Sequence, residues 1–256
     1  MFFDTHAHLD DERFANDREL VIERAREAGV GLIMNIGYDV RHAQNTVLLT
    51  REYEHIYGSV GVHPHEAKHF DEKGLEELYR LAAEPKIMAI GEIGLDYYWD
   101  NSPREIQRDV FRRMINFAKE LDKPIIIHDR DAHQDVFDMI KEEKASKVGG
   151  VFHCYSGSWP LAREALKMGF YISLAGPLTF TNAVRLHEVA KMVPLENLLI
   201  ETDCPYLTPT PWRGKRNEPA FVVKVAEKLA ELRRIPLEEI EQKTTENGKR
   251  AFRITR

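Results

Sequence analysis

The sequence has little cysteine and no long apolar run. Only two cysteines, Cys154 and Cys204, occur among the 256 residues, which excludes a disulfide scaffold and a cysteine-rich zinc module. No stretch approaches the roughly 20 apolar residues that a membrane-spanning helix needs. The first residues carry no basic segment ahead of an apolar one, unlike a signal peptide. We therefore expect a cytoplasmic protein without a membrane partner, whose cysteines are small buried hydrophobes.

An excess of positive charge is also missing. Lysine and arginine number 36 against 42 acidic residues, which gives a formal net charge of −6. This balance argues against a protein that binds nucleic acid by bulk charge alone, while leaving room for a local basic patch. Stretches rich in glycine, serine or proline, repeats and low-complexity segments are absent as well. The sequence therefore predicts one domain over residues 1–256.

What the sequence does have is a regular alternation of short apolar runs and amphipathic stretches. The runs are brief and continuous, as in buried parallel strands, and cover residues 2–5, 31–36, 56–62, 87–93, 124–127, 148–152, 170–174 and 198–200. Helical periodicity marks residues 17–28, 103–121, 132–140, 160–168, 182–192 and 220–232. About eight strand–helix units predict an α/β protein with a (β/α)8 TIM barrel, the alternative being a doubly wound open sheet. The pattern of residues 237–252 predicts an extra C-terminal helix that packs at the end of the barrel.

Polar side chains end or interrupt several of these strands, where the working residues of such barrels lie. A set of imidazoles and carboxylates is placed this way: His6, His8, Glu92, His128, His153 and Asp203. Donors of this kind without thiolates suit zinc, manganese, iron, cobalt or magnesium. Six donors exceed the needs of one tetrahedral ion, so we expect a binuclear centre with a carboxylate between the ions.

Simpler explanations exist for single members of this set. A lone histidine is usually structural, and a buried Glu92 could be neutralised by an arginine instead of a metal. Asp4 and Glu201 lie one step deeper than His6 and Asp203, where they either orient the ligands or form an internal ion pair.

Candidate substrate-binding residues follow the same strand ends. His63 and His65 end the third strand, Arg130 follows His128, and a basic loop carries Arg213, Lys215 and Arg216. These side chains could contact phosphate, and aromatic residues near them could stack on unpaired bases; the aromatic residues are Tyr97, Tyr98, Trp99, Tyr155 and Trp159. The alternative is a solvated charged loop and aromatics that pack on neighbours, which we prefer for Trp99 and Trp159.

In this order, the residues resemble the TatD family of metal-dependent deoxyribonucleases, in the amidohydrolase superfamily. The resemblance covers essentially the whole chain and is carried by residues 3–8, 61–65, 91–97, 128, 153–157, 201–207 and 213–219. It implies a (β/α)8 barrel that binds two divalent cations, Mg²⁺, Mn²⁺ or Zn²⁺. It further implies one ion on His6, His8, Glu92 and Asp203, and a second on Glu92, His128 and His153.

The expected function is hydrolysis of a phosphodiester through a metal-activated water, with Asp203 as general base and Glu92 between the ions. The resemblance implies a 3′-5′ exodeoxyribonuclease acting on single-stranded DNA, with RNA as a further substrate. Alternatives that use the same binuclear site are a small-molecule amidohydrolase or lactonase and an aminoacyl-tRNA editing deacylase. A purely structural metal is disfavoured, because structural zinc sites are closed and four-coordinate. The sequence does not indicate an oligomeric state, and a monomer is compatible with it.

Overall fold

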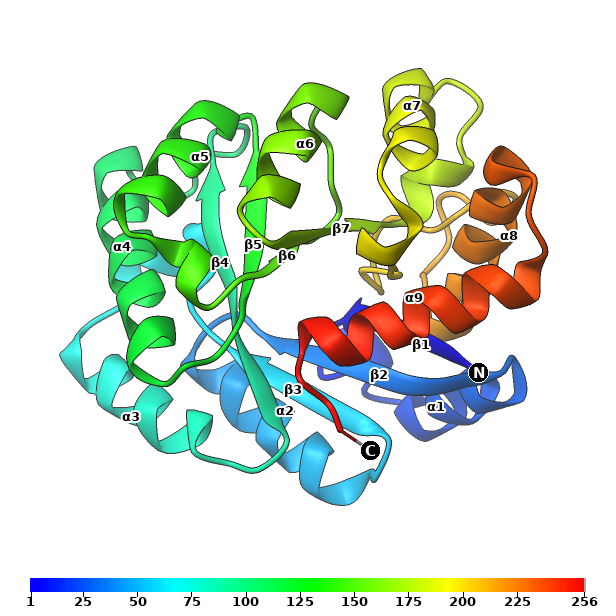
Figure 1. Ribbon diagram of the computed structural model, residues 1–256. Helices are drawn as coiled ribbons and strands as arrows, with labels where there is room; N and C mark the ends of the chain where they lie inside the picture. The colour runs from blue at the N-terminus through cyan, green and yellow to red at the C-terminus, as the bar shows by residue number, and fades with distance from the viewer. Residues whose placement is uncertain (256) are drawn as a thin grey trace.

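A parallel sheet that curls into a nearly closed barrel organises the molecule, as the computed structural model shows (Figure 1). The structure describes residues 1–255. Within them, eight strands are hydrogen-bonded in sequence order: β1 (Phe2–Ala7), β2 (Val30–Gly37), β3 (Ile56–Val60), β4 (Ile87–Asp96), β5 (Ile125–Arg130), β6 (Gly150–Phe152), β7 (Phe170–Leu174) and β8 (Leu198–Ile200). The predicted TIM barrel is confirmed, and the open doubly wound sheet is excluded by this order.

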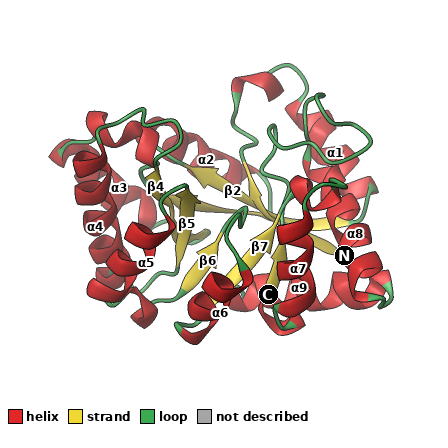
Figure 2. Ribbon diagram, turned by 90° about the horizontal axis from the view of Figure 1, so that it is seen from above, coloured by secondary structure: helices red, strands yellow, loops and turns green. Residues whose placement is uncertain are grey.

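Helices surround the strands (Figure 2). In residues 1–255 they are α1 (Arg18–Glu27), α2 (Val40–Glu52), α3 (Glu72–Ala82), α4 (Arg104–Glu120), α5 (His133–Glu142), α6 (Trp159–Lys167), α7 (Val184–Met192), α8 (Val222–Arg233) and α9 (Leu237–Ala251). Those predicted from periodicity differ from the structure by two residues at most. Asp39 and Asp71 cap α2 and α3 by accepting the backbone N–H three residues ahead. No helix of this part of the chain is long and apolar enough to cross a membrane.

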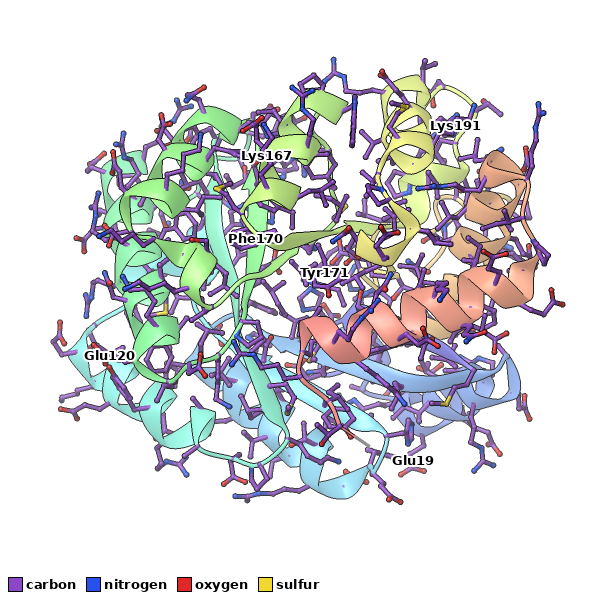
Figure 3. The ribbon with its side chains drawn as sticks, in the orientation of Figure 1. Glu19, Glu120, Lys167, Phe170, Tyr171 and Lys191 are labelled. Carbon is purple, nitrogen blue, oxygen red and sulfur yellow. The ribbon has the colours of Figure 1, made fainter. Side chains whose placement is uncertain are left out.

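Side chains alternate between two apolar layers along each strand. In β7, Phe170 belongs to the layer between strands and helices, whereas Tyr171 packs against the cluster inside the barrel (Figure 3). The C-terminal segment contributes to that inner cluster. Phe252 is fully buried there, and its ring meets the ring of Phe3 edge-on with 6.1 Å between the ring centres. Helix α9 packs against β1, beside which Figure 1 shows it, and against β8. Its hydrogen bonds reach the carbonyls of Met1 and Leu198 at the amino ends of these strands, so the predicted extra helix does pack at the end of the barrel.

The seam between β1 and the end of β8 is closed by one isolated parallel bridge, Ala7 to Cys204, together with side-chain hydrogen bonds. Thr5 Oγ1 donates to the carbonyl of Ile200 at 2.9 Å, and the Asp4 carboxylate accepts from the backbone N–H and the hydroxyl of Thr202 at 2.8 and 2.6 Å. Burial raises the pKa of Asp4 to about 8, against the hydrogen bonds from Thr202 that lower it. Asp4 therefore joins the two ends of the barrel, and it reaches His6 only through that residue's backbone N–H at 3.4 Å.

Candidate metal centre

Glu92 stands at the centre of a cluster of imidazoles at the carboxyl ends of the strands. It lies inside β4, where the pairing with β5 shifts register between Ile90 and Ile93, and its side chain is buried. Such irregularities re-aim side chains relative to the regular pleat of a strand. The two carboxylate oxygens face different partners, so Glu92 divides the cluster into two halves.

In the first half, Oε2 of Glu92 faces the imidazoles of β1 and its end. His6 Nε2 lies 3.3 Å from Glu92 Oε2 and 3.6 Å from Asp203 Oδ1. His8 Nε2 lies 3.4 Å from Asp203 Oδ1 and 3.9 Å from Glu92 Oε2. Asp203 follows β8 in a left-handed conformation with φ of 56°, which aspartate tolerates better than most residues, and its backbone N–H donates to the carbonyl of His6 at 2.9 Å.

In the second half, Oε1 of Glu92 is surrounded by one imidazole from β5 and two from the segments that follow β6 and β3. His128 Nδ1 and His153 Nε2 lie 2.7 and 2.8 Å from Glu92 Oε1 and 3.3 Å from each other. His63 Nε2 lies 3.5 Å from the same oxygen. The backbone N–H of His65 donates to His63 Nδ1 at 3.1 Å, which makes His63 Nε2 the protonated nitrogen of a neutral ring. His63 therefore presents a donor rather than a ligand lone pair.

Two further carboxylates hold the imidazoles from outside. Glu201 accepts the backbone N–H of Cys154 at 2.7 Å, and its Oε1 lies at ion-pair distance, 3.3 Å, from His153 Nδ1 without hydrogen-bond geometry. Its role in orienting His153 therefore stays a prediction. Asp96 accepts Nε2–H from His128 at 3.1 Å and from His65 at 2.9 Å. The sequence interpretation gave Asp96 no role. Its signal was a carboxylate four residues after Glu92 at the end of a buried strand.

Burial disfavours the charged form of every group in the cluster, yet strong mutual interactions overcome it. Burial acts to raise the pKa of Glu92, but the positive charge of His153 helps to hold that pKa well below its usual range. Burial likewise opposes protonation of His153, but Glu92 and Glu201 together raise its pKa well above the ordinary value. A hydrogen bond with His8 lowers the pKa of Asp203 against the same burial. The cluster thus attracts positive charge, which protons or metal cations can supply.

The residues fit divalent cations by geometry and by donor chemistry. Both ring nitrogens of His6 are buried without a hydrogen-bond partner in residues 1–255, beside two carboxylate oxygens. The ligand atoms of His6, His8 and Asp203 lie within 4.8 Å of one another. His128 Nδ1 and His153 Nε2 lie 2.7 and 2.8 Å from Glu92 Oε1. An unpaired buried imidazole is costly unless something binds it, and metal coordination removes that cost.

The predicted substrate-binding residues do not all lie beside the cluster. His65 sits beside His63, and Arg130 is exposed at the end of β5. Tyr97 faces away from the cluster: its hydroxyl donates to Asp135 on α5 at 2.6 Å and Arg104 stacks on its ring at 4.3 Å. Tyr97 thereby lines a separate cavity of about 630 Å³ between α4 and α5.

The basic residues of the loop after β8 also differ in their surroundings. Arg213 and Lys215 are exposed, and within residues 1–255 neither forms an ion pair. Arg216 instead makes two hydrogen bonds to the carboxylate of Asp17 at 2.8 and 2.6 Å and packs over the ring of Phe14. Its charge is therefore neutralised by a structural partner, and its predicted role in binding substrate stays a prediction.

The two cysteines differ. Cys204 is fully buried in the apolar layer, as expected. Cys154 is partly exposed and has a φ of 40°, so the expectation that it is a buried hydrophobe was wrong. The physical reason is that β6 ends at Phe152, so the alternation of faces no longer applies two residues later.

Comparison with known proteins settles the family. The model of the family described as TatD related DNase matches residues 3–253. The chain belongs to this family. It is 52% identical over 254 residues to a protein of Bacillus subtilis (strain 168) described as the uncharacterized metal-dependent hydrolase YabD, which covers 99% of this chain and 100% of that protein. The family resemblance inferred from the sequence is confirmed.

Two further TatD relatives extend the comparison. The chain is 34% identical over 237 residues to the 3′-5′ ssDNA/RNA exonuclease TatD of Escherichia fergusonii, covering 90% of this chain and 91% of that one. The crystal structure of YJJV, a TatD homologue from Escherichia coli K12, superposes with a TM-score of 0.94 at 32% identity over 99% of this chain and 98% of its own. Family membership together with the imidazole–carboxylate cluster identifies this TatD-family protein as a metal-dependent hydrolase.

Proposed function

We propose that this TatD-family hydrolase is a 3′-5′ exonuclease that cleaves phosphodiesters in single-stranded DNA, with RNA as a further substrate. The observation that carries the proposal is one buried carboxylate, Glu92, shared between two imidazole sets at the barrel mouth. That pattern favours two cations close together, the arrangement that many phosphodiester-cleaving enzymes use. The name of the Escherichia fergusonii relative supports the polarity and the single-stranded substrate.

Two divalent cations, Mg²⁺, Mn²⁺ or Zn²⁺, are part of this proposal. His6, His8, Glu92 and Asp203 would hold one, and Glu92, His128 and His153 would hold the other. When bound, such cations stabilise negative charge on phosphate oxygens and lower the pKa of water. A cytoplasmic location, a single domain over residues 1–256 and a monomeric state stay predictions from the sequence.

Asp203 is the candidate general base. Its carboxylate is the more exposed of the two central acids, with 14% of the side chain accessible against 4% for Glu92, so it is the one that meets water at the mouth. The lowered pKa keeps it ionised at neutral pH. An ionised carboxylate can take the proton that the attacking water loses as it approaches phosphorus.

Phosphate oxygens have donors on more than one side of the cluster. The Nε2–H of His63 is already oriented by the backbone of His65, and burial keeps the His63 pKa well below its usual value, so the ring stays a neutral donor. Arg213 and Lys215 offer unpaired charge farther out. A neutral imidazole donor near the ions and cations at the rim suit a polyanion whose scissile phosphate enters the mouth.

A substrate panel tests this proposal. The chelated protein is reloaded separately with Mg²⁺, Mn²⁺, Co²⁺ and Zn²⁺ and assayed on single strands labelled at the 3′ or the 5′ end, a cyclic amide, a lactone and a mischarged tRNA. We expect early loss of the 3′ label and a ladder of shortened strands carrying the 5′ label. Turnover of only the amide, the lactone or the aminoacyl ester would overturn the phosphodiester claim and select one of the alternative hydrolases. The Glu92→Gln variant controls for contaminating nucleases.

A further inference from the structure

An exposed pair of aromatic rings stands beside the metal cluster with an arginine over it. Tyr98 and Trp99 are 56% and 57% exposed and meet edge-on at 5.0 Å between ring centres. The guanidinium of Arg130 lies 4.2 Å from the centre of the Tyr98 ring and 5.6 Å from that of Trp99. Within residues 1–255 no carboxylate lies at ion-pair distance from Arg130. Trp99 packs on a neighbour, as expected, but that neighbour is the exposed Tyr98, and 57% of Trp99 stays accessible. We name these three residues the aromatic platform.

The backbone under the platform is held firmly. Asp96 Oδ1 accepts the backbone N–H groups of Tyr98 and Trp99 at 3.0 and 2.9 Å. On the other side, Arg104 donates to the carbonyl of Tyr97 at 3.2 Å and pairs with Asp100 at 2.7 Å. Exposed rings on a fixed backbone lose little conformational freedom when a ligand stacks on them, so they bind flat molecules at low entropic cost.

The platform has a fixed position relative to the catalytic centre. Arg130 is two residues beyond His128 on β5, so the two side chains leave the same face of the strand about 7 Å apart. The carboxylate that holds the backbone of Tyr98 and Trp99 also holds His128 through its other oxygen. A base stacked on the platform would therefore lie beside the end of β5 that carries His128.

We propose that Tyr98, Trp99 and Arg130 bind an unpaired nucleobase and the adjoining phosphate of the strand whose end occupies the metal centre. This inference rests on the proposed function and adds the reason for a single-stranded substrate. The rings stack on a base that is not already stacked in a duplex, and the unpaired guanidinium neutralises one phosphate. Arginine suits both tasks because its planar group stacks on aromatics and donates to phosphate.

Binding to the chelated full-length protein tests the platform without cleavage. A short fluorescein-labelled oligothymidylate is titrated, with anisotropy as the signal, against the wild type, Tyr98→Ala/Trp99→Ala and Arg130→Gln. Loss of the rings should weaken binding of the single strand about tenfold or more, while binding of a duplex of equal length changes little. Arg130→Gln should also reduce the slope of log affinity against log salt by about 0.7, the value for one phosphate on a single strand.

A matched control separates stacking from general loss of exposed apolar surface. Leu48 is a comparably exposed apolar side chain, 59% accessible, on α2, a helix that contributes no residue to the cluster or to the platform. Leu48→Ala should therefore bind like the wild type. Trp99→Phe should retain most of the affinity that Trp99→Ala loses. Unchanged binding in the double variant, or equal weakening for duplex and single strand, would overturn the platform. Absence of any nuclease turnover alongside ring-dependent binding would instead overturn the proposed function and leave the platform standing.

Discussion

Replacing Asp96 by asparagine should weaken binding of the proposed second metal ion while leaving binding of the first nearly unchanged. The Asp96 carboxylate accepts from two imidazoles through Oδ2 and from two backbone N–H groups through Oδ1. Asparagine fills the same volume, and its Oδ1 can keep the backbone bonds. Its amide group must then face His65 and His128 with N–H donors in place of an acceptor.

The physical consequence falls on the tautomer of His128. Its Nε2 now has to accept, so the ring proton moves to Nδ1, which lies 2.7 Å from Glu92 Oε1 and points into the second half of the cluster. A protonated Nδ1 cannot ligate a cation. Losing a hydrogen bond to a charged partner costs about 1.5–3 kcal/mol, and loss of such an outer carboxylate lowers metal affinity about 10–100-fold.

Zinc titration in competition with a chromophoric chelator measures both ions separately. The wild type should bind two per chain, and Asp96→Asn should bind the first within about threefold of the wild type and the second about 10–100-fold more weakly. Asp135→Asn is the control, because Asp135 accepts from Tyr97 but contacts no imidazole of the cluster. Asp96→Ala leaves room for water at Nε2, so it should impair the second ion less than asparagine does. Equal loss of both ions, or an intact second ion in Asp96→Asn, would refute the tautomer argument.

Three further predictions concern the base, the basic loop and the core. Asp203→Asn should lower turnover by about 100-fold or more while the thermal unfolding midpoint stays near that of the wild type; near-normal nuclease activity in the metal-loaded variant would contradict its role as base. Arg213→Gln with Lys215→Gln should weaken single-strand binding and reduce the salt slope by about 1.4, measured by anisotropy, whereas Lys243→Gln on α9 should not. Phe252→Ala, which empties a fully buried position at the end of the barrel, should cost about 3 kcal/mol in urea unfolding; a change below about 1 kcal/mol would mean that the C-terminal segment does not support the barrel.

Much of the barrel follows from the sequence because buried parallel strands are short and continuously apolar. The pattern fails at the strands' carboxyl ends, where β4 and β5 continue three residues beyond the predicted limits. Asp96 and His128 lie in these extensions, and their polarity breaks the apolar run while the backbone stays in the sheet. The same polarity allowed the cluster to be predicted, since polar side chains at strand ends stand out against the apolar runs.

Other features depend on partners that no local pattern specifies. The role of Asp96 rests on imidazoles 31 and 32 positions away, and Arg216 pairs with Asp17 at a separation of 199. The register shift that turns Glu92 toward the imidazoles is likewise invisible to a periodicity of two. Residue type and strand position therefore locate candidate ligands, whereas pairing over long distances decides which charges remain free to meet a substrate.

The division of the centre by Glu92 is tested most directly by anomalous diffraction from crystals of the protein loaded with Mn²⁺. Two peaks are predicted, one beside Glu92 Oε2 with His6, His8 and Asp203, and one beside Glu92 Oε1 with His128 and His153. A single peak, or peaks away from Glu92, would contradict a shared carboxylate and with it the binuclear mechanism proposed for phosphodiester cleavage.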